Sequence, residues 1–574
     1  MANKRVVIDP ITRIEGHLRI EVEVDENNVV QKAYSSSTLW RGIELILKNR
    51  DPRDAGLMTQ RICGVCTYSH YKAGIESVEN ALGVIPPYNA KLVRSILNES
   101  LYMHDHVVHF YHLHGLDWVD VVSALSADPK KASELAFKYS DSPIATGTDE
   151  LTAVQKKVAG FVERGQLGPF ANAYWGNKTY KFSPEQNLIA LSHYLKALEV
   201  QRTAAQMFAI FGAKQPHGQS LVVGGITSVR DVLSPARLAE WLSKYEIVKD
   251  FIDRAYYADV VMAAEAYSTE ASVLGGLGVK NFMAADGMML NRTENLFESG
   301  FIKDGDLSKV YDIDEMKIKE DVTHAWYTGD EPLQPYDGET IQNYTGFVDG
   351  DTVNGKAKVI DPNDKYSWVK SPRYDEQAVE VGPLASLLVN YARGNEKVKK
   401  EVGDFLTRTG LPVGALFTTL GRTAARMLQT KLISDNAIIT FNSLIENLKT
   451  DDSTYTKFEI DPTKEYMGRF IGEVPRGVLS HWVKIKNGLI DNYQAVVPTT
   501  WNAGPIDKNG QIGPYEASLI GLKLEDPKKP LEVIRVIHSF DPCMACSVHV
   551  MDIKGQELSQ YKVNPLGSGV ACSV

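Results

Sequence analysis

Hydrophobic side chains follow two different periods along this chain. Near the N-terminus, residues 6–8 and 17–24 alternate or run apolar, and the polar turn at residues 26–28 allows residues 29–34 to return as the second strand of a hairpin. Farther on, apolar side chains recur at the spacing of a buried helix face. This spacing predicts helices over residues 88–114, 184–211, 235–267, 381–391, 397–407 and 414–447. We therefore expect strands first and long helices after them.

The periodicity is lost between residues 300 and 374, where Asp, Gly, Pro and Tyr accumulate as in an irregular excursion. Near the C-terminus, residues 482–490 and 493–497 flank Asp491-Asn492, which predicts a second hairpin. No repeat with a period of 20–50 residues is visible, which disfavours a solenoid or a propeller. The pattern predicts one large α+β unit with a core of long helices and β-rich N- and C-terminal parts.

Composition narrows the possible partners. The chain has 574 residues and a formal net charge of −10, with no run of Lys and Arg, so we expect no nucleic-acid partner. No apolar stretch reaches the roughly 18 residues of a membrane-spanning helix, and the N-terminus lacks the apolar core of a signal peptide. We expect contact with a membrane only through partner proteins.

The five cysteines are distributed unevenly. Cys63 and Cys66 form one C-x-x-C unit, Cys543 and Cys546 form a second, and Cys572 lies near the C-terminus. A C-x-x-C unit allows two thiolates to bind one ion, and we expect Gly64 and Pro542 to permit the tight backbone. Two units make a four-sulfur site. A structural zinc site is one interpretation, but zinc ribbons usually close within a few tens of residues, whereas these pairs come from opposite ends of the chain.

Several motifs together resemble the large subunit of nickel–iron hydrogenases. They are Arg61–Cys66 with His70, Asp541–Cys546 with His549, Arg13–His17, Arg41–Glu44, Asp51–Ala55, Gln215–His217, Val223–Gly225, Pro475–Gly477 with His481-Trp482, and Val497–Asn502. The matches span essentially the whole chain. The resemblance implies that family's fold and an enzyme that reversibly cleaves H2 to protons and electrons.

The resemblance also implies a bimetallic centre. Cys63, Cys66, Cys543 and Cys546 would bind nickel, and Cys66 and Cys546 would also bridge to an iron that carries carbon monoxide and two cyanides. Thiolates suit nickel and iron better than carboxylates do. Cysteine stands at all four positions, so the chain is not the selenocysteine-containing variant.

Other residues acquire roles around this centre by resemblance. Arg476 matches an arginine over the open metal face and beside one cyanide, and Thr499 matches a donor to the other cyanide. Asp105 and Asp541 match carboxylates that hold these groups in place, although arginine–aspartate pairs are often ordinary buried salt bridges. His70 matches a donor to a bridging sulfur, with a structural core histidine as the alternative.

Cleavage of H2 also needs a base for the proton. Because a guanidinium normally stays protonated, we favour the thiolate of Cys543 as the first acceptor and assign Arg476 to positioning and polarisation. The resemblance places Glu15 beside Cys543 as the first relay, and partial burial near a negative cluster is expected to raise its pKa. The alternative is an ion pair between Glu15 and Arg13.

Two further sites are implied by resemblance alone. Glu44, the backbone carbonyl of Ala495 and His549 match the ligands of a magnesium ion, and His217 matches a residue that faces the nearest iron–sulfur cluster of a partner subunit. The five histidines at positions 104, 106, 109, 112 and 114 point to several faces of a helix, so we expect core or interface roles for them rather than a second metal.

Electrons must leave a buried site through further redox centres. Iron–sulfur clusters are held chiefly by cysteines, and this chain has no further cysteine cluster that could bind one. The family pairs this chain with a small subunit that carries such clusters and an export signal. We therefore expect a heterodimer, or a dimer of heterodimers, in the periplasm and associated with the membrane through partners.

The chain continues past His549 to Val574. In the family a maturation endopeptidase removes this tail once nickel-insertion factors have acted, so we expect a domain of residues 1–549 and a propeptide of residues 550–574. A permanent C-terminal strand is the alternative. A structural zinc or scaffold subunit and a hydrogen-sensing regulator remain the competing functions. A quinone-reducing respiratory subunit of the same fold would lack the four cysteines.

Overall fold

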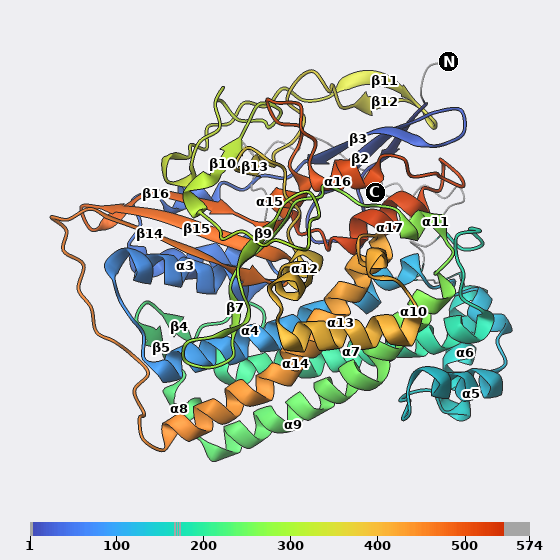
Figure 1. The fold of residues 1–574 in the computed structure, drawn as a ribbon, viewed down its shortest axis with the longest axis horizontal. Coiled ribbons are helices and arrows are strands. Elements are labelled where there is room, and N and C mark those ends of the chain that lie inside the picture. The colour runs from blue at the N-terminus through green and yellow to red at the C-terminus, as the bar shows by residue number, and fades with distance from the viewer. Residues whose placement is uncertain (1–3, 166–167, 169, 171–173, 545–574) are drawn as a thin grey trace.

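The computed structural model describes residues 4–165, 168, 170 and 174–544, and it combines a bundle of long helices with several small antiparallel sheets (Figure 1). The long helices lie side by side in the lower half of Figure 1, and most of the strands lie above them. This arrangement confirms the predicted α+β class with a helical core and β-rich ends. Cys546, His549 and the tail lie outside the described residues.

Four long helices form the bundle: α4 (Tyr88–Val108), α7 (Pro184–Gly212), α9 (Pro235–Phe251) and α14 (Thr419–Leu448). Helix α4 packs between α14 and α7, and α7 also packs on α9. The start of α7 is encoded locally, because Ser183 caps the backbone nitrogen of Gln186 while the Gln186 side chain returns to Ser183. Most side chains of α4 are buried, so this helix lies in the interior of the bundle.

Two predicted helices contain a change of winding. Helix α4 ends at Val108 and continues as a π-helical segment, η3 (His109–His114), and α9 continues through η7 (Ile252–Tyr256) into α10 (Tyr257–Ala266). Wider turns of this kind are uncommon in helices and frequent near functional sites.

The remaining α-helices are shorter than α4, α7 and α14. They are α1 (Ile43–Leu47), α2 (Ala55–Thr59), α3 (Thr67–Leu82), α5 (Pro129–Tyr139), α6 (Thr148–Glu163), α8 (Val229–Val232), α11 (Ala271–Leu274), α12 (Pro383–Arg393), α13 (Glu396–Thr409), α15 (Pro498–Ala503), α16 (Pro514–Leu519) and α17 (Leu531–Ser539). The predicted helices over residues 381–391 and 397–407 correspond to α12 and α13. Among the described residues, every helix is too short or too polar to cross a membrane.

The N-terminal sheet has the order β1 (Lys4–Ile8), β2 (Leu18–Val24) and β3 (Val30–Ser37), all antiparallel. Asn28 adopts a positive φ of 61° in the predicted turn between β2 and β3, a conformation that Asn tolerates well. Valines and isoleucines of β1 and β2 are buried against residues of α17 and of the 325–369 segment. The predicted hairpin is confirmed.

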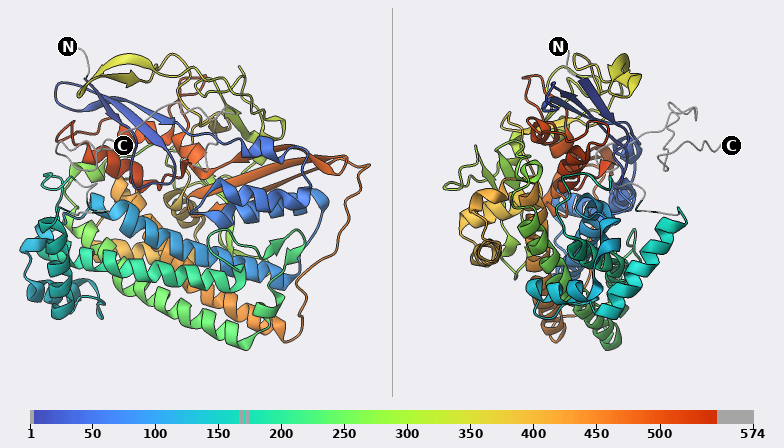
Figure 2. Two further views of the ribbon diagram at one scale, coloured as in Figure 1. Left: turned by 180° about the vertical axis from the view of Figure 1, so that it is seen from behind. Right: turned by 90° about the vertical axis from the view of Figure 1, so that its right-hand side faces the viewer.

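A second antiparallel sheet carries the predicted site residue Arg476 in a turn between two of its strands. Strands β14 (Tyr466–Val474), β15 (Gly477–Lys486) and β16 (Leu489–Val496) pair in that order. Helix α3 packs against β14 and β15, as the blue helix beside the orange strands in Figure 2 shows.

The predicted position of the second hairpin turn was wrong. The turn is Asn487-Gly488, where φ is 54° and 74°, and Asp491 and Asn492 lie inside β16. Asn-Gly is the preferred pair for a two-residue turn in which both residues need positive φ. Strand β15 is buried along most of its length, so it shows no alternation that would have marked its end.

The segment between residues 300 and 374 is irregular, as predicted, and contains only short strands and two single-turn 3-10 helices. The other strands in the described part of the chain are β4 (Leu221–Val222), β5 (Gly225–Ile226), β6 (Phe282–Ala284), β7 (Gly287–Met289), β8 (Asn295–Phe297), β9 (Gly300–Ile302), β10 (Ile318–Asp321), β11 (Val348–Thr352), β12 (Gly355–Val359) and β13 (Ser371–Tyr374).

A buried ion pair joins α14 to the segment before α12. Arg422 contacts Glu380 through two hydrogen bonds of 2.7 and 2.8 Å, and both side chains are almost fully buried. Arg422→Met would leave the Glu380 carboxylate buried without its cation, so we expect the free energy of unfolding to fall by about 3–5 kcal/mol. The thermal unfolding midpoint of the purified protein measures this.

The matched control is the exposed pair of Lys400 and Asp404, which lie 2.7 Å apart on α13. Lys400→Met should change the free energy of unfolding by less than about 0.5 kcal/mol. Equal losses in the two variants would show that burial does not determine the effect.

Candidate metal centre

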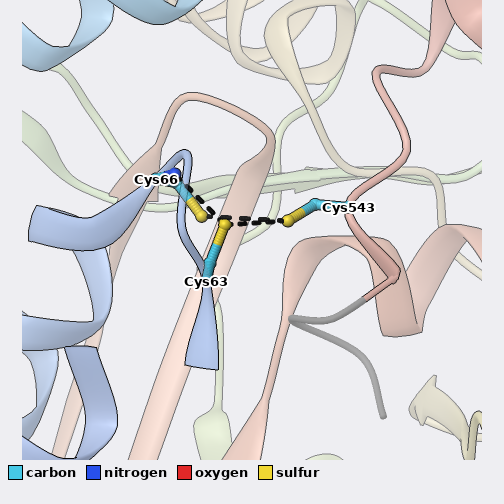
Figure 3. Close-up of side chains that lie close together, drawn as sticks. All are labelled: Cys63, Cys66 and Cys543. Carbon is cyan, nitrogen blue, oxygen red and sulfur yellow. Dashed lines mark hydrogen bonds between the residues drawn. The ribbon is translucent and has the colours of Figure 1, made fainter. Parts of the chain in front are cut away.

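Three of the four paired cysteines point toward one another in the interior of the protein (Figure 3). The sulfur of Cys543 lies 3.2 Å from that of Cys63 and 4.0 Å from that of Cys66, and all three side chains are buried. These separations suit ligands of one ion, since each metal–sulfur bond is about 2.3 Å long. The described cysteines from opposite ends of the chain therefore form one group, whereas Cys546 lies outside the described residues.

The N-terminal pair is held by a short helix and the start of another. Cys63 follows the 3-10 helix η2 (Gln60–Ile62), and Cys66 caps the N-terminus of α3. The backbone nitrogens of Val65 and Cys66 both lie 3.2 Å from the Cys63 sulfur. Backbone N–H groups and a helix N-terminus favour a thiolate over a thiol, so this loop is suited to ligands in the charged form.

Gly64 was predicted to be needed for this turn, and the structure does not support that reason. Its φ is not positive, and an added Cβ would meet no described atom within 4 Å. The hydrogen bonds from the Val65 and Cys66 nitrogens to Cys63 form this turn, and no contact with a described residue requires glycine at position 64.

The C-terminal cysteine is held by an exchange with the N-terminal loop. The backbone nitrogen of Glu15 donates to the Pro542 carbonyl at 3.4 Å, and that of Met544 donates to the Glu15 carbonyl at 2.8 Å. Asp541, just before this bridge, adopts a positive φ of 58°. The bridge places the Glu15 side chain against Cys543, with Oε2 3.3 Å from the sulfur.

The alternative pairing of Glu15 with Arg13 is not observed. Arg13 instead forms a 2.6 Å ion pair with Asp117 and donates to the Leu113 carbonyl at 2.7 Å. Glu15 therefore faces the cysteine group, as the resemblance implied.

Arg476 supplies a buried positive charge beside the sulfurs. Its guanidinium contacts Asp541 Oδ1 at 3.0 Å and Asp105 Oδ2 at 3.6 Å, and the side chain is only 4% exposed. Burial alone would lower its pKa, but the negative charges of Asp541, Cys543, Cys66 and Asp105 together hold the pKa well above its usual value. Arg476 therefore remains a cation, which favours the predicted positioning role over a role as base.

The tight turn between β14 and β15 determines the position of Arg476. Gly477, directly after Arg476, has a φ of 117°, and a Cβ there would lie 2.4 Å from the backbone nitrogen of Gly382. Here a glycine is required by both conformation and close approach.

A small cavity opens beside Cys66. Its lining includes Cys66, His70, Pro475, Arg476 and Thr499. The hydroxyl oxygen of Thr499 accepts a hydrogen bond from the Cys543 backbone nitrogen at 3.2 Å, so its own hydrogen is available for another acceptor. Arg476 Nη1 has no hydrogen-bond partner among the described residues. Two donors thus remain for a ligand with acceptor atoms, which fits the cyanides implied by the resemblance.

His70 is buried behind the N-terminal cysteines. Its Nδ1 lies 3.1 Å from His481 Nε2, and His481 Nδ1 lies 2.6 Å from the Tyr493 hydroxyl. Burial lowers the pKa of His70 to about 4, so the ring is neutral near pH 7. The second ring nitrogen remains for the cysteine side, where the Cys63 sulfur is close enough to influence the pKa.

The remaining implied positions in the described part of the chain are His217, Glu44 and Ala495. His217 adopts a positive φ of 61°, is partly exposed, and is close enough to Cys63 and Arg61 for both to influence its pKa, which burial lowers. Farther out, Glu44 Oε1 accepts a hydrogen bond from the Ala495 backbone nitrogen at 3.0 Å, and Oε2 accepts one from Thr340 at 2.7 Å. Glu44 and Ala495 are therefore neighbours, while His549, their proposed co-ligand, lies outside the described residues.

The histidines of residues 104–114 take part in several internal contacts. His106 lies between Thr430 and the Pro475 carbonyl, His109 contacts the His538 carbonyl, and His114 contacts Asp117 and Thr423. His538 also contacts Asp117, at 2.6 Å. Each ring nitrogen of His114 and His538 has a hydrogen-bond partner, so this trio forms a structural network.

Sequence reasoning missed the residues that complete this network. The Asp117 carboxylate contacts the side chains of Arg13, His114 and His538. It therefore connects the N-terminal loop to α17. Opposite charges and histidine donors hold the pKa of Asp117 well below its usual range despite burial. Nothing in the spacing of these residues along the chain announces that they meet.

The chain is similar over most of its length to known proteins. Residues 41–549 match the sequence family described as nickel-dependent hydrogenase. The quinone-reactive Ni/Fe-hydrogenase large chain of Wolinella succinogenes is 66% identical over 571 residues, which is 99% of each chain. The uptake hydrogenase large subunit of Rhizobium leguminosarum bv. viciae is 46% identical over 98% of each chain. The hydrogenase-2 large chain of Escherichia coli (strain K12) is 44% identical over 98% of this chain and 100% of its own length.

Solved structures agree with the sequence matches. The Ni-Fe-Se hydrogenase of Desulfovibrio vulgaris Hildenborough in the reduced state superposes with a TM-score of 0.75 at 30% identity and covers 95% of this chain and 100% of its own. The reduced, active Ni-Fe-Se hydrogenase of Desulfomicrobium baculatum gives a TM-score of 0.72 at 31% identity, with 95% and 100% covered.

Proposed function

The chain belongs to the nickel-dependent hydrogenases as their large, catalytic subunit, and we propose that Cys63, Cys66, Cys543 and Cys546 hold a nickel–iron centre with one carbon monoxide and two cyanides on the iron. The observation that supports this most directly is the meeting of three buried sulfurs beside a cationic arginine and a small cavity. A closed structural zinc site would have no use for a buried guanidinium with a spare donor. When bound, the centre would supply the polarisation that allows H2 to separate into protons and electrons.

Side chains of this protein would accept the proton released from H2 and carry it away from the centre. The thiolate of Cys543 accepts it at the sulfur and passes it to Glu15 Oε2, 3.3 Å away. Arg476 and Thr499 would donate to the cyanides, and Asp105 and Asp541 hold Arg476 in place through their carboxylates. The second ring nitrogen of His70 would donate to one of the cysteine sulfurs that hold the centre.

A magnesium ion would occupy the site formed by Glu44, the Ala495 carbonyl and His549. The contact between Glu44 and Ala495 supports this site, and carboxylate and carbonyl oxygens are the ligands that magnesium prefers. This ion would tie the end of the mature chain to the sheet of β14–β16.

A small-subunit partner with iron–sulfur clusters would receive the electrons, with His217 facing the nearest cluster. The similarity to a chain named quinone-reactive and to chains named uptake hydrogenase supports H2 oxidation with delivery of electrons towards quinone. It also favours the periplasmic, membrane-associated enzyme over the hydrogen-sensing regulator. Residues 550–574 would be removed by an endopeptidase after nickel insertion.

Infrared spectroscopy of the purified protein tests the metal centre. We expect absorption from metal-bound carbon monoxide and cyanide, together with about one nickel per chain. Cys63→Ser removes one of the sulfurs that meet at the site, so nickel and these bands should both be lost, whereas Cys572→Ser should retain them. Zinc without nickel in the unaltered protein would contradict the proposal.

Glu15→Gln tests the proton relay. The amide cannot accept and release a proton as the carboxylate does, so we expect H2/D2O exchange to fall by roughly 10²–10⁴-fold with nickel content unchanged. Glu516→Gln is the control, because Glu516 is a buried carboxyl bonded to Ser35 and Tyr366 outside the site, and it should retain exchange. Normal exchange in Glu15→Gln would remove Glu15 from the path.

The mass of the active chain tests the maturation step. We expect the intact mass of active protein to correspond to a chain that ends at His549, and nickel-free preparations to retain residues 550–574. A full-length chain with full activity would exclude the propeptide.

A further inference from the structure

A cleft with room for several water molecules lies on the side of the molecule formed by α3, α4, β7 and β14. Its volume is about 350 Å³, far more than the roughly 10–15 Å³ that a single water needs. Exposed side chains of Ile85 and Lys91 line its outer part, and Asn98, Met288 and Glu473 line its inner part. Asp105 lies farther along α4, and Arg476 follows the end of β14.

The inner end of the cleft carries polar atoms without protein partners. Asn98 and Glu473 are 4% and 3% exposed, and Asn98 Oδ1 and Glu473 Oε1 accept no hydrogen bond from the described residues. The other oxygen of Glu473 accepts one from the Ala285 backbone nitrogen at 3.1 Å. Buried polar oxygens of this kind are normally satisfied by water, and the adjoining cleft can supply it.

Glu473 is also suited to gaining and losing a proton. Burial raises its pKa to about 8, although the Ala285 nitrogen and the nearby Gln429 amide lower it. A carboxyl with a pKa near the ambient pH can both accept and release a proton readily.

A line of side chains on α4 continues inward from Glu473. Asn98, Tyr102 and Asp105 are four and three residues apart, so they share one face of the helix. The Tyr102 hydroxyl is buried and has no hydrogen-bond partner among the described residues. After burial itself, the two groups that raise the Tyr102 pKa are Glu473 and Asp105, so both carboxyls lie close enough to the hydroxyl to influence it. Asp105 then reaches Arg476 at 3.6 Å.

We propose that Glu473 and Tyr102 form a second proton path, which connects the Asp105–Arg476 side of the metal site to water in the cleft. This path rests on the proposed position of the metal centre and is separate from the path through Glu15. The Asp105 carboxylate first takes up a proton released at the metal site and passes it to the Tyr102 oxygen. Tyr102 releases its own hydroxyl proton to the Glu473 carboxylate, and Glu473 releases one to cleft water. Because these side chains are not hydrogen-bonded to one another, bridging water carries the proton between them. Each residue returns to its starting state, and one proton has moved outward.

Residual proton exchange provides the first test, on the purified complex with its partner subunit. Glu15→Gln should leave slow H2/D2O exchange, carried by the second path. Adding Glu473→Gln should lower that residual rate at least about tenfold, because the amide can still accept from Ala285 but cannot relay a proton.

The matched control is Glu99→Gln in the same Glu15→Gln background. Glu99 is a buried glutamate of α4 whose pKa burial also raises to about 8, but it is bonded to Asn436 and Thr440 and does not line the cleft. It should leave the residual rate unchanged. Equal losses with Glu99→Gln and Glu473→Gln, no effect of Glu473→Gln, or no residual exchange in Glu15→Gln would each overturn the proposal.

Infrared spectroscopy gives a readout that does not depend on turnover. On transfer of the protein to D2O, the protonated carboxyl band that Glu473→Gln removes should shift rapidly, because the cleft wets Glu473, and the band that Glu99→Gln removes should shift slowly. Equally slow exchange at both carboxyls would overturn the path. Loss of the carbon monoxide and cyanide bands would instead indicate failure of the metal-site assignment, so the two failures are distinguishable.

Discussion

The structure depends on compensation of negative charge in its interior. Several thiolates gathered in one buried place repel one another and lose their hydration, so they need nearby cations, donors or metals. The chain provides Arg476, whose own burial is in turn tolerable only because Asp541, Asp105 and the cysteines surround it. Neither the sulfurs nor the guanidinium would be stable there alone. The cations of a metal centre complete the same balance, which is why the metal ligands and the arginine must be considered as one unit.

The sequence allowed the cysteine ligands of this unit to be predicted, but not the residues that surround and position them. Two C-x-x-C units at opposite ends of a cysteine-poor chain predicted the meeting of the sulfurs, and the described cysteines do meet. The roles of Arg476, Thr499 and Glu15 came only from resemblance, since an arginine or a glutamate carries no spacing that reveals its partner. Local turn chemistry was also unevenly readable. Gly477 is required where it stands, Gly64 is not, and the two look alike in sequence.

Long helices were predicted well because their apolar spacing persists over many turns, as in α7 and α14. The end of β15 was misplaced because a strand buried on both faces has no alternation to interpret. The Asp117 network and the line from Asn98 to Asp105 could not be inferred, since each depends on elements that meet only after folding. Asp117 and His538, for example, are 421 positions apart. The periodicity of the sequence therefore predicts which helices and strands form, whereas tertiary packing decides which residues become neighbours.

The bridge between Glu15 and residues 542–544 has a consequence for how the protein is made. Glu15 leaves the ribosome early, while Cys543 is 528 positions later, so at about 5–20 residues per second the partner emerges roughly half a minute to two minutes afterwards. During that interval the pocket around Cys63 and Cys66 has one side missing. The nascent protein therefore lacks one side of its cysteine group until nearly the whole chain has been synthesised.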